Sequence, residues 1–474
     1  MNDLISKDKK HIWHPFTQHQ TSGDPLGIVR AEGSLLFDEA GKEYIDANSS
    51  WWVNTHGHAH PHIGAALEEQ FKTLDHVVFA GITHPKAAEL AERLTKKLPL
   101  RLDRVFFSDN GSTAIEVALK MTFQFWFNRG EAKRKVLAIS GAYHGDTFGA
   151  MSVGERDYFN RPFEPFFFDV DYLPFPTNSN EALVLSQAEE LFATGDFSSF
   201  IAEPLVQGAS GMRMYSPEIL DKLVRLAKKY DVFVIFDEVM TGFGRTGKMF
   251  ATDHCQEIPD IIAFSKGLTA GILPMGLTVT SNEMFEAFLD DDMARGFLHG
   301  HSFTGNPMAC AAACASLDLF ERDETWSNID NICVWNQQLE KELSELPQIE
   351  GLKTFGTILR FEIKSDESTY FATKIRAKAY THFLETGVLI RPLGNVIFIN
   401  PPYCLSHKEF EIVRKSILTF LEESLIKQSG LGLFGGDDAG QPQATSPMTV
   451  DVDGGEGPQA EIEVVDDHDD MLSL

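Results

Sequence analysis

The sequence is poor in cysteine and short of positive charge. Only five of its 474 residues are cysteine, an odd number with no CxxC pair among them. Such a set does not build a disulfide framework and is typical of a reduced, cytoplasmic protein. Lys and Arg number 41 against 69 Asp and Glu, for a net charge of -28. Because nucleic acids are bound by basic surfaces, this balance argues against a nucleic-acid partner.

Long apolar runs are missing as well. No stretch reaches the roughly 18 apolar residues that a membrane-spanning helix needs. Residues 1–16 are polar and lack the apolar core of a signal peptide. The hydrophobic share is nevertheless 43%, with 37 Phe, which is enough for a large core. We therefore expect a globular protein of the cytoplasm with no membrane partner.

The middle of the chain alternates short β-branched or aromatic runs with helical patterns. Runs of this kind are "DRVFFSD", "KVLAIS", "FSSFIAEP", "VFVIFDEV" and "DIIAFSK". Nearly continuous apolar strands are expected in a sheet that helices cover on both faces. The sequence thus predicts an α/β fold with a mostly parallel central sheet, and ligands outside the carboxyl ends of its strands.

Four segments follow from the patterns along the chain. We predict a large domain over 61–327, and a smaller α+β domain that combines 1–60 with 328–427. Hairpin patterns occur within 33–47 and 387–402 of the smaller unit. Residues 430–474 are rich in Gly, Pro, Asp and Glu without Lys or Arg, which predicts a disordered acidic tail.

Two motifs point to chemistry only weakly. Gly242–Gly247 matches G-x-G-x-x-G after a strand, but the residues that follow make a poor amphipathic helix, which disfavours a nicotinamide site. Four alternating histidines could suggest a metal site, but Pro61 interrupts them and no carboxylate or cysteine set accompanies them, so no metal is predicted. These histidines are His56, His58, His60 and His62.

Three strand ends carry a stronger signal. Gly111 and Ser112 open a helix directly after a strand, where free amides bind a phosphate or simply cap the helix. Asp237 ends a buried strand, where a carboxylate needs several hydrogen-bond donors or a cationic partner such as Arg245 or a protonated heterocyclic nitrogen. Lys266 also ends an apolar strand, and a buried ammonium must reach water, find a carboxylate or be neutralised.

Together, these three features suit pyridoxal 5'-phosphate. The phosphate would lie on the helix start, the pyridine nitrogen on Asp237 and the aldehyde on Lys266, which a covalent Schiff base would neutralise. Each feature alone is ambiguous, whereas the combination is specific for this cofactor.

The motifs "FDEVMTGFGRTG" and "AFSKGLTAG" resemble those of the class III aminotransferases of fold type I. The similarity extends over nearly all of 1–427. It is strongest to the members that aminate 8-amino-7-oxononanoate to 7,8-diaminononanoate in biotin biosynthesis, through "HIWHPFTQ", "SSWWVNTHGHAHP" and "GAYHGDTFGAMSVG". The resemblance implies a homodimer whose active sites are shared between subunits.

The resemblance also implies roles for single residues. Lys266 would bond the cofactor and shuttle a proton, Asp237 would face the pyridine nitrogen, and Tyr143 would stack on the ring. Gly111 and Ser112 would bind the phosphate, joined by His301 and Ser302. The substrate-binding residues implied are Phe16, Trp51, Trp52, Tyr143, Lys266, Gly300 and Arg391, with Gly300–Ser302 contributed by the other subunit.

The amino donor and the substrate class are open at this point. Phe16 stands where members that use S-adenosylmethionine have tyrosine, so the donor is S-adenosylmethionine or lysine. An ω-amino acid or diamine:pyruvate aminotransferase would share every cofactor residue. Outside this class, the alternatives are a nicotinamide dehydrogenase built on Gly242–Gly247 and a binding protein acting through the acidic tail.

Overall fold

The computed structural model describes residues 3–157, 159–365 and 374–428. The predicted acidic tail, 430–474, lies outside the described residues. Within the described part of the chain, no helix is both long and apolar enough to cross a membrane.

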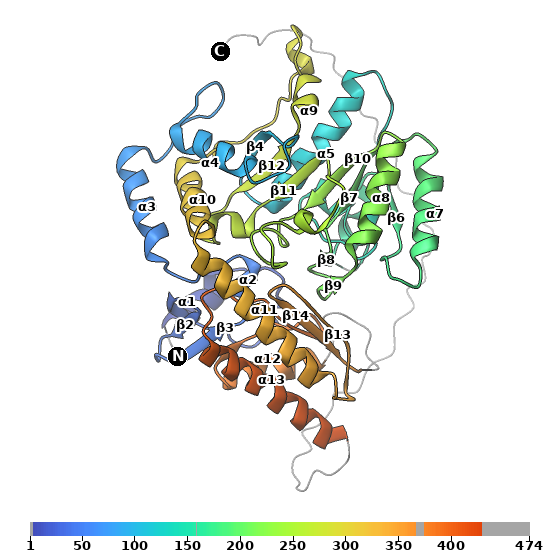
Figure 1. The fold of residues 1–474 in the computed structure, drawn as a ribbon. Helices are drawn as coiled ribbons and strands as arrows, with labels where there is room; N and C mark the ends of the chain where they lie inside the picture. Colours follow the sequence, from blue (N-terminus) through green and yellow to red (C-terminus); the bar gives the residue numbers. More distant parts are fainter. Residues whose placement is uncertain (1–2, 158, 366–373, 429–474) are drawn as a thin grey trace, which may run out of the picture.

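A seven-stranded sheet forms the centre of the larger unit (Figure 1). The spatial order is β4-β12-β11-β10-β7-β5-β6, in which only β12 runs antiparallel to its neighbours. The predicted α/β class with a mostly parallel sheet is confirmed. The strands are β4 (Arg104–Ser108), β5 (Lys135–Ile139), β6 (Val170–Leu173), β7 (Phe197–Ala202), β10 (Phe233–Asp237), β11 (Ile261–Phe264) and β12 (Gly276–Thr280).

Both faces of this sheet are covered, which explains the continuous apolar runs. Ile235 and Ile261 face a core shared with α5, while Phe236 and Ile262 face the second and larger core. All six residues of β7 are buried. The helices of this unit are α3 (Pro61–Thr73), α4 (Pro85–Thr95), α5 (Gly111–Asn128), α6 (Phe148–Ser152), α7 (Glu181–Phe192), α8 (Pro217–Lys229), α9 (Asn282–Glu286) and α10 (Pro307–Phe320).

Short elements connect these layers. A two-stranded ribbon, β8 (Val206–Gln207) with β9 (Arg213–Met214), follows β7. The 3-10 turns are η1 (Arg161–Phe166), η2 (Ala251–His254), η3 (Lys266–Thr269) and η4 (Met293–Arg295). The turn η3 begins directly after β11, so Lys266 lies at the carboxyl end of that strand.

The two ends of the described chain meet in a four-stranded sheet of order β1-β2-β3-β15. Val388 of β15 pairs in parallel with Ile45 of β3. The strands are β1 (Ile28–Glu32), β2 (Leu35–Asp38), β3 (Glu43–Asp46) and β15 (Val388–Leu389). The accompanying helices are α1 (Asp3–His11), α2 (Ser49–Trp52), α11 (Asp323–Leu343), α12 (Lys374–Glu385) and α13 (His407–Gln428), which Figure 1 shows below the large sheet.

A separate three-stranded sheet of order β13-β14-β16 lies in the same part of the molecule. Its strands are β13 (Ile349–Phe355), β14 (Ile358–Ile363) and β16 (Val396–Ile399). The expected hairpin within 33–47 forms, as β2 and β3. The hairpin expected within 387–402 forms only as a tight turn, in which Leu393 and Val396 exchange backbone hydrogen bonds of 3.0 Å, while β15 and β16 belong to different sheets. β15 exchanges its backbone bonds with β3, and Pro392 has no N–H with which to extend the strand.

Arg245 ties the two parts together. Its side chain is 1% exposed and donates to four backbone carbonyls of the smaller part. The acceptors are Pro401 at 2.8 Å, Trp52 at 3.4 Å, and Asn400 and Asn54 at 3.5 Å. The guanidinium also lies 5.1 Å from the centre of the Tyr403 ring. This one charged group therefore joins segments that are about 350 residues apart along the chain.

Truncating Phe200 at the centre of β7 should destabilise the fold strongly. Phe200 is fully buried and pairs with Leu137 and Val234 on the two neighbouring strands. We expect Phe200→Ala to cost about 3–5 kcal/mol, because it leaves a cavity in a packed core. Denaturant unfolding measures the change, with Phe127→Ala on α5 as control, since Phe127 is 73% exposed. Equal midpoints for the two variants would contradict the assigned core.

Candidate active site

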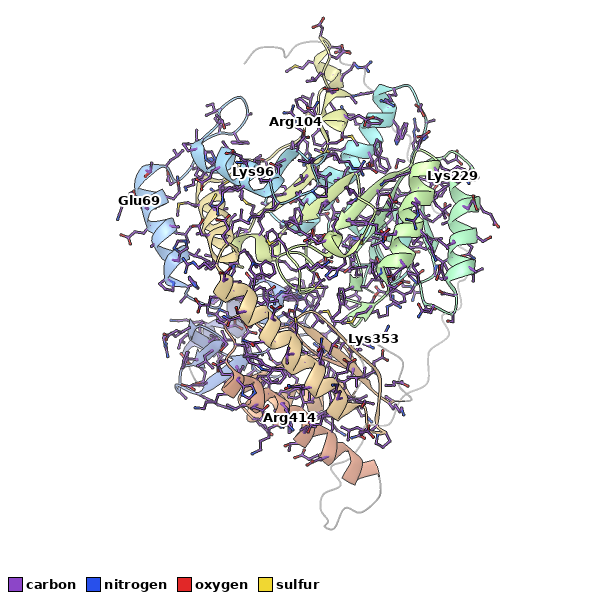
Figure 2. All side chains as sticks on the ribbon, viewed as in Figure 1. Glu69, Lys96, Arg104, Lys229, Lys353 and Arg414 are labelled. Carbon is purple, nitrogen blue, oxygen red and sulfur yellow. The ribbon has the colours of Figure 1, made fainter. Side chains whose placement is uncertain are left out.

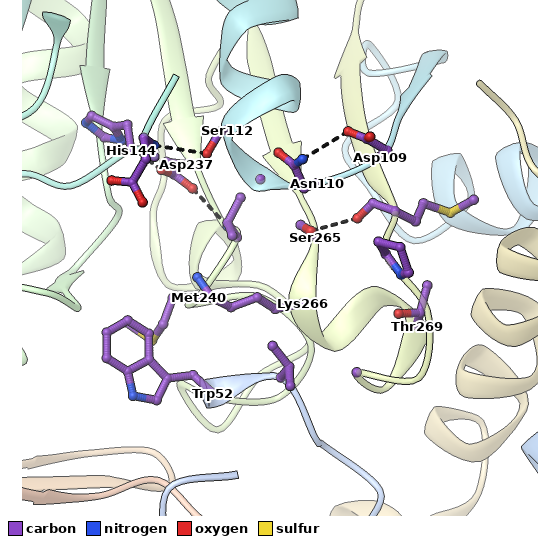
Figure 3. A pocket seen from close by; sticks show the side chains of 18 of the residues that line it. Trp52, Asp109, Asn110, Ser112, His144, Asp237, Met240, Ser265, Lys266 and Thr269 are labelled. Carbon is purple, nitrogen blue, oxygen red and sulfur yellow. Dashed lines mark hydrogen bonds and ion pairs between the residues drawn. The ribbon is translucent and has the colours of Figure 1, made fainter. Parts of the chain in front are cut away.

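A cavity of about 520 Å³ opens at the carboxyl ends of the parallel strands. It collects side chains from the ends of β4, β10 and β11 and from the loop after β5 (Figure 3). Six of the predicted site residues line it. These six are Trp52, Gly111, Ser112, Tyr143, Asp237 and Lys266.

The start of α5 forms one wall. The Asn110 side chain caps the helix by accepting a hydrogen bond from the Thr113 N–H at 2.9 Å. In return, the Asn110 N–H donates to the Thr113 hydroxyl oxygen. Free amides remain at the first positions of the helix, where the helix dipole is positive. A Cβ on Gly111 would lie 2.8 Å from Val239, so only glycine fits there. The Ser112 Oγ accepts from the Asp146 N–H at 3.2 Å and faces the cavity.

Asp237 has a partner that sequence reasoning missed. Its Oδ2 lies 2.7 Å from Nδ1 of the buried His144, and its Oδ1 accepts from the Val239 N–H at 3.0 Å. The suggested pairing with Arg245 is wrong, because both terminal nitrogens of that guanidinium donate to backbone carbonyls in another part of the fold. His144 stands in the motif "GAYHG", but no spacing rule joins it to Asp237.

Lys266 is half-buried, and its side chain lines the cavity without a hydrogen-bond or ion-pair partner among the described side chains. Its Nζ lies 5.3 Å from the centre of the Trp52 ring. Its backbone has φ 43°, a left-handed conformation that is strained for lysine. Burial lowers the pKa of Lys266, although Asp237 and Glu203 oppose the shift. Figure 3 shows the side chain reaching into the space between Trp52 and Asp237.

Glu203 lines the cavity next to Tyr143. Its carboxylate accepts from the Tyr143 N–H at 3.0 Å and from the Gly208 N–H at 2.8 Å. Burial raises the pKa of Glu203 to about 7, with His144 acting in the opposite direction. The Tyr143 hydroxyl donates to Asp146 at 3.0 Å, and burial raises the pKa of Tyr143 as well. These contacts fix the loop that carries the tyrosine.

Three other predicted residues form a cluster without lining the cavity itself. The rings of Phe16 and Trp51 lie 5.5 Å apart, and the Arg391 guanidinium lies 4.8 Å from the centre of the Trp51 ring. Trp51 is 40% exposed, whereas Trp52 is 7% exposed and reaches inward. The cluster thus offers an aromatic and cationic surface next to Trp52.

Gly300, His301 and Ser302 lie in the segment before α10 and do not line the cavity of their own chain. The His301 N–H donates to Thr304 at 3.0 Å, and its Nδ1 accepts from the Phe303 N–H at 3.2 Å. The neighbouring Phe303 is 63% exposed. Within one chain, this segment therefore makes no contact that assigns it a role in the site.

Comparison with known proteins gives one consistent result. The family model described as aminotransferase class-III matches residues 17–421. The adenosylmethionine-8-amino-7-oxononanoate aminotransferase of Synechococcus elongatus is 44% identical over 425 residues, which cover 87% of this chain and 99% of that protein. The crystal structure of the enzyme of the same name from Methanocaldococcus jannaschii has a TM-score of 0.85 at 33% identity, covering 89% and 98% of the two chains.

A further solved structure is an amine transaminase from an uncultivated Pseudomonas species, described as PLP-bound in its internal aldimine form. It has a TM-score of 0.81 at 28% identity, and the similarity covers 87% of this chain and 98% of that one. The overall fold is thus shared with enzymes of more than one name.

Replacing Lys266 with methionine should stabilise the protein that carries no small molecule. A lysine whose pKa is lowered binds fewer protons in the folded state than in the unfolded state. Stability therefore rises with pH between the lowered pKa and 10.5, and the lysine costs most below that window. We expect Lys266→Met to raise the melting temperature at neutral pH and to flatten this pH dependence.

Thermal melts across neutral to alkaline pH measure the effect. The control is Lys96→Met at the residue directly after α4, whose side chain is 69% exposed (labelled in Figure 2). A lower melting temperature for Lys266→Met than for the parent at neutral pH would show that the amine is not costly where it lies.

Proposed function

The chain belongs to the class III aminotransferases, and we propose that it transfers an amino group to the ketone of 8-amino-7-oxononanoate, forming 7,8-diaminononanoate in biotin biosynthesis in the cytoplasm. The observation that carries the proposal is that Lys266, which has no charged partner among the described residues, lines the same cavity as Asp237 and the start of α5. The names of the most similar relatives select the substrate.

Pyridoxal 5'-phosphate fits the residues of the cavity. The free amides of Gly111 and Ser112 and the Ser112 hydroxyl would hold its phosphate, Asp237 its ring nitrogen and Lys266 its aldehyde. The proposed stacking partner of the ring is Tyr143. When bound, this cofactor supplies an electron sink that stabilises negative charge on the substrate carbon.

The protein's own part is to place charges and move one proton. Asp237, held by His144 at 2.7 Å and by the Val239 N–H, would place a carboxylate against the ring nitrogen and so favour its protonated form. Lys266 Nζ would act as the base that accepts the proton from the donor carbon. Its lowered pKa suits a base, because a larger share of the amine is neutral near pH 7.

The rim suits a long apolar acceptor with a terminal carboxylate. Phe16, Trp51 and Trp52 offer aromatic walls for the chain, and Arg391 offers a guanidinium for the carboxylate. An ω-amino acid or diamine:pyruvate aminotransferase would share the cofactor residues. The ω-transaminase structure from Pseudomonas jessenii, in complex with PMP, has a TM-score of 0.84 but only 26% identity, so it supports that alternative less strongly.

Both half-reactions can be followed through the visible absorbance of the lysine-bound cofactor. We expect S-adenosylmethionine or lysine to bleach the band and 8-amino-7-oxononanoate to restore it, whereas pyruvate restores it far more slowly. Lys266→Ala should show no such band. Restoration by pyruvate alone would select the ω-amino acid alternative, and a permanently colourless protein would contradict the cofactor proposal.

Phe16 makes the same assay informative about the donor. Its ring can stack on adenine but lacks a hydroxyl. If S-adenosylmethionine bleaches the band, stacking of Phe16 and Trp51 suffices for the donor. If only lysine bleaches the band, the acceptor and cofactor assignments stand and the donor is lysine.

We propose that the enzyme is a homodimer with shared active sites. Large apolar side chains are exposed around the 300–303 segment: Phe303 is 63% exposed, Leu298 69% and Val78 56%. The rings of His76 and Phe303 lie 5.8 Å apart, so the two surface segments are neighbours. Apolar side chains gathered in this way favour a subunit interface. Across it, Gly300, His301 and Ser302 would reach the second subunit's cofactor phosphate and substrate.

Hybrid dimers can test the shared site. A chain with Lys266→Ala and a chain with Ser302→Asp are co-expressed with different affinity tags, and the hybrid is purified through both tags. One of its two sites keeps Lys266 and a neighbouring Ser302, so we expect about half of the wild-type activity, well above either parent.

The matched control places both substitutions on one chain and pairs it with a wild-type chain. If sites are shared, each site of this hybrid lacks one of the two residues and activity falls to the level of the single variants. Half-activity in the control, with none gained in the first hybrid, would show that each subunit works alone.

A further inference from the structure

The turn that carries Trp51 and Trp52 has a strained backbone. Ser49, Ser50 and Trp52 have φ angles of 50°, 57° and 64°, in the left-handed region that L residues avoid. Such strain persists only where the surrounding structure over-determines it, and it is concentrated at functional sites. The restraints on this turn therefore identify the groups that shape the substrate side of the cavity.

Asp46 is the main restraint on one side of the turn. Its side chain is fully buried at the end of β3. One carboxylate oxygen accepts from the Ser50 N–H at 2.8 Å. The other accepts from the Ser50 hydroxyl at 2.9 Å and lies 2.9 Å from Nε2 of His58. A buried carboxylate with this many donors is strongly held in place.

The proton position on His58 follows from its second contact. The Asn54 amide nitrogen, which can only donate, lies 2.9 Å from Nδ1 of His58. Nδ1 must therefore accept, and Nε2 carries the proton that His58 donates to Asp46. The chain of contacts from Asn54 through His58 to Asp46 thus supports the turn from behind.

The opposite side of the turn is held through its carbonyls and its neighbours. Arg245 donates to the carbonyls of Trp52 and Asn54, as described for the joint between the two parts. The Asn48 side chain accepts from the Arg391 N–H at 2.6 Å. The same short segment therefore sets the position of Trp51, Trp52 and the backbone of Arg391.

We infer that Asp46 is a positioning residue for the substrate pocket: by holding Ser50 it keeps Trp51 against Phe16 and Arg391, and Trp52 against Lys266. Asp46 itself does not line the cavity. The inference rests on the proposed function, because it assumes that substrate lies on these side chains.

Asp46→Asn compared with Asp38→Asn tests this role. Asp38 also accepts from two backbone amides and one hydroxyl, those of Ala40, Lys42 and Tyr44, in the same sheet but at a turn outside the cavity. Asn at 46 turns an amide toward the donors of Ser50 or His58. We expect KM for the acceptor to rise at least about tenfold while kcat falls less than about threefold. Asp38→Asn should leave KM unchanged.

A second measurement needs no acceptor. The Trp52 ring stabilises positive charge near Lys266 Nζ. If the ring is displaced, the lysine-bound cofactor should lose its proton at a pH midpoint that is lower by roughly 0.5. The absorbance titration of Asp46→Asn should show this shift and that of Asp38→Asn should not. If the wild type does not aminate 8-amino-7-oxononanoate, the proposed function is wrong. The titration still tests whether Asp46 positions Trp52, because it needs no acceptor substrate.

Ser50→Gly covers the case in which Asp46→Asn does not fold. Glycine removes the hydroxyl contact and relieves the left-handed strain, so the variant should melt no lower than the wild type yet show a raised KM. Wild-type KM and titration midpoint in both the Ser50 and Asp46 variants would overturn the inference. So would changes in Asp46→Asn that match those in Asp38→Asn.

Discussion

The cost of desolvating a primary amine that has no ion-pair partner is the constraint on which the site depends. Lys266 Nζ lies 5.3 Å from the centre of the Trp52 ring, desolvation lowers its pKa, and the carboxylates of Asp237 and Glu203 act on it only from a distance. An amine in such a place is held either neutral or covalently bound. The strands deliver it there, because β11 ends at Phe264 and η3 begins at Lys266. The neighbours of this lysine therefore define what the cavity can do.

The local pattern predicted the parts that depend on one segment. Apolar runs predicted the covered sheet, and polar residues at strand ends predicted that Gly111, Asp237 and Lys266 would meet, because parallel strands end at a common edge. The partners across the fold were not predictable in this way. His144 pairs with Asp237 from a loop 93 positions earlier, and no periodicity connects the two. The suggested pairing of Asp237 with Arg245 was wrong. Arg245 is close to Asp237 in the sequence, but its side chain contacts backbone carbonyls in another part of the fold.

The hairpin predicted within 387–402 is limited to the turn between Leu393 and Val396 for a related reason. Two short apolar runs separated by glycine have the pattern of a hairpin, yet β15 finds its partner in β3, about 340 residues away. Pairing with a distant strand is decided by the assembled core, since Val388 and Ile45 are both buried there. The division of the chain into units, and the roles assigned to Gly300–Ser302, stay predictions, since they concern boundaries and a second subunit rather than contacts within this chain.

In the proposed site, chemistry and selectivity belong to different parts of the chain. The residues that one chain is proposed to contribute to its own cofactor site come from the large sheet and its loops, whose strands are fixed by two cores. Phe16, Trp51 and Arg391 come from the smaller part, which is tied to the large one through Arg245 and through the strained turn. A change in that turn can move the aromatic walls without disturbing Asp237 or the start of α5. Solved structures that are 25–33% identical to this chain share its fold at TM-scores of 0.82–0.85 while carrying different names, so the fold alone does not fix which substrate is admitted, and the side chains of the rim must do so.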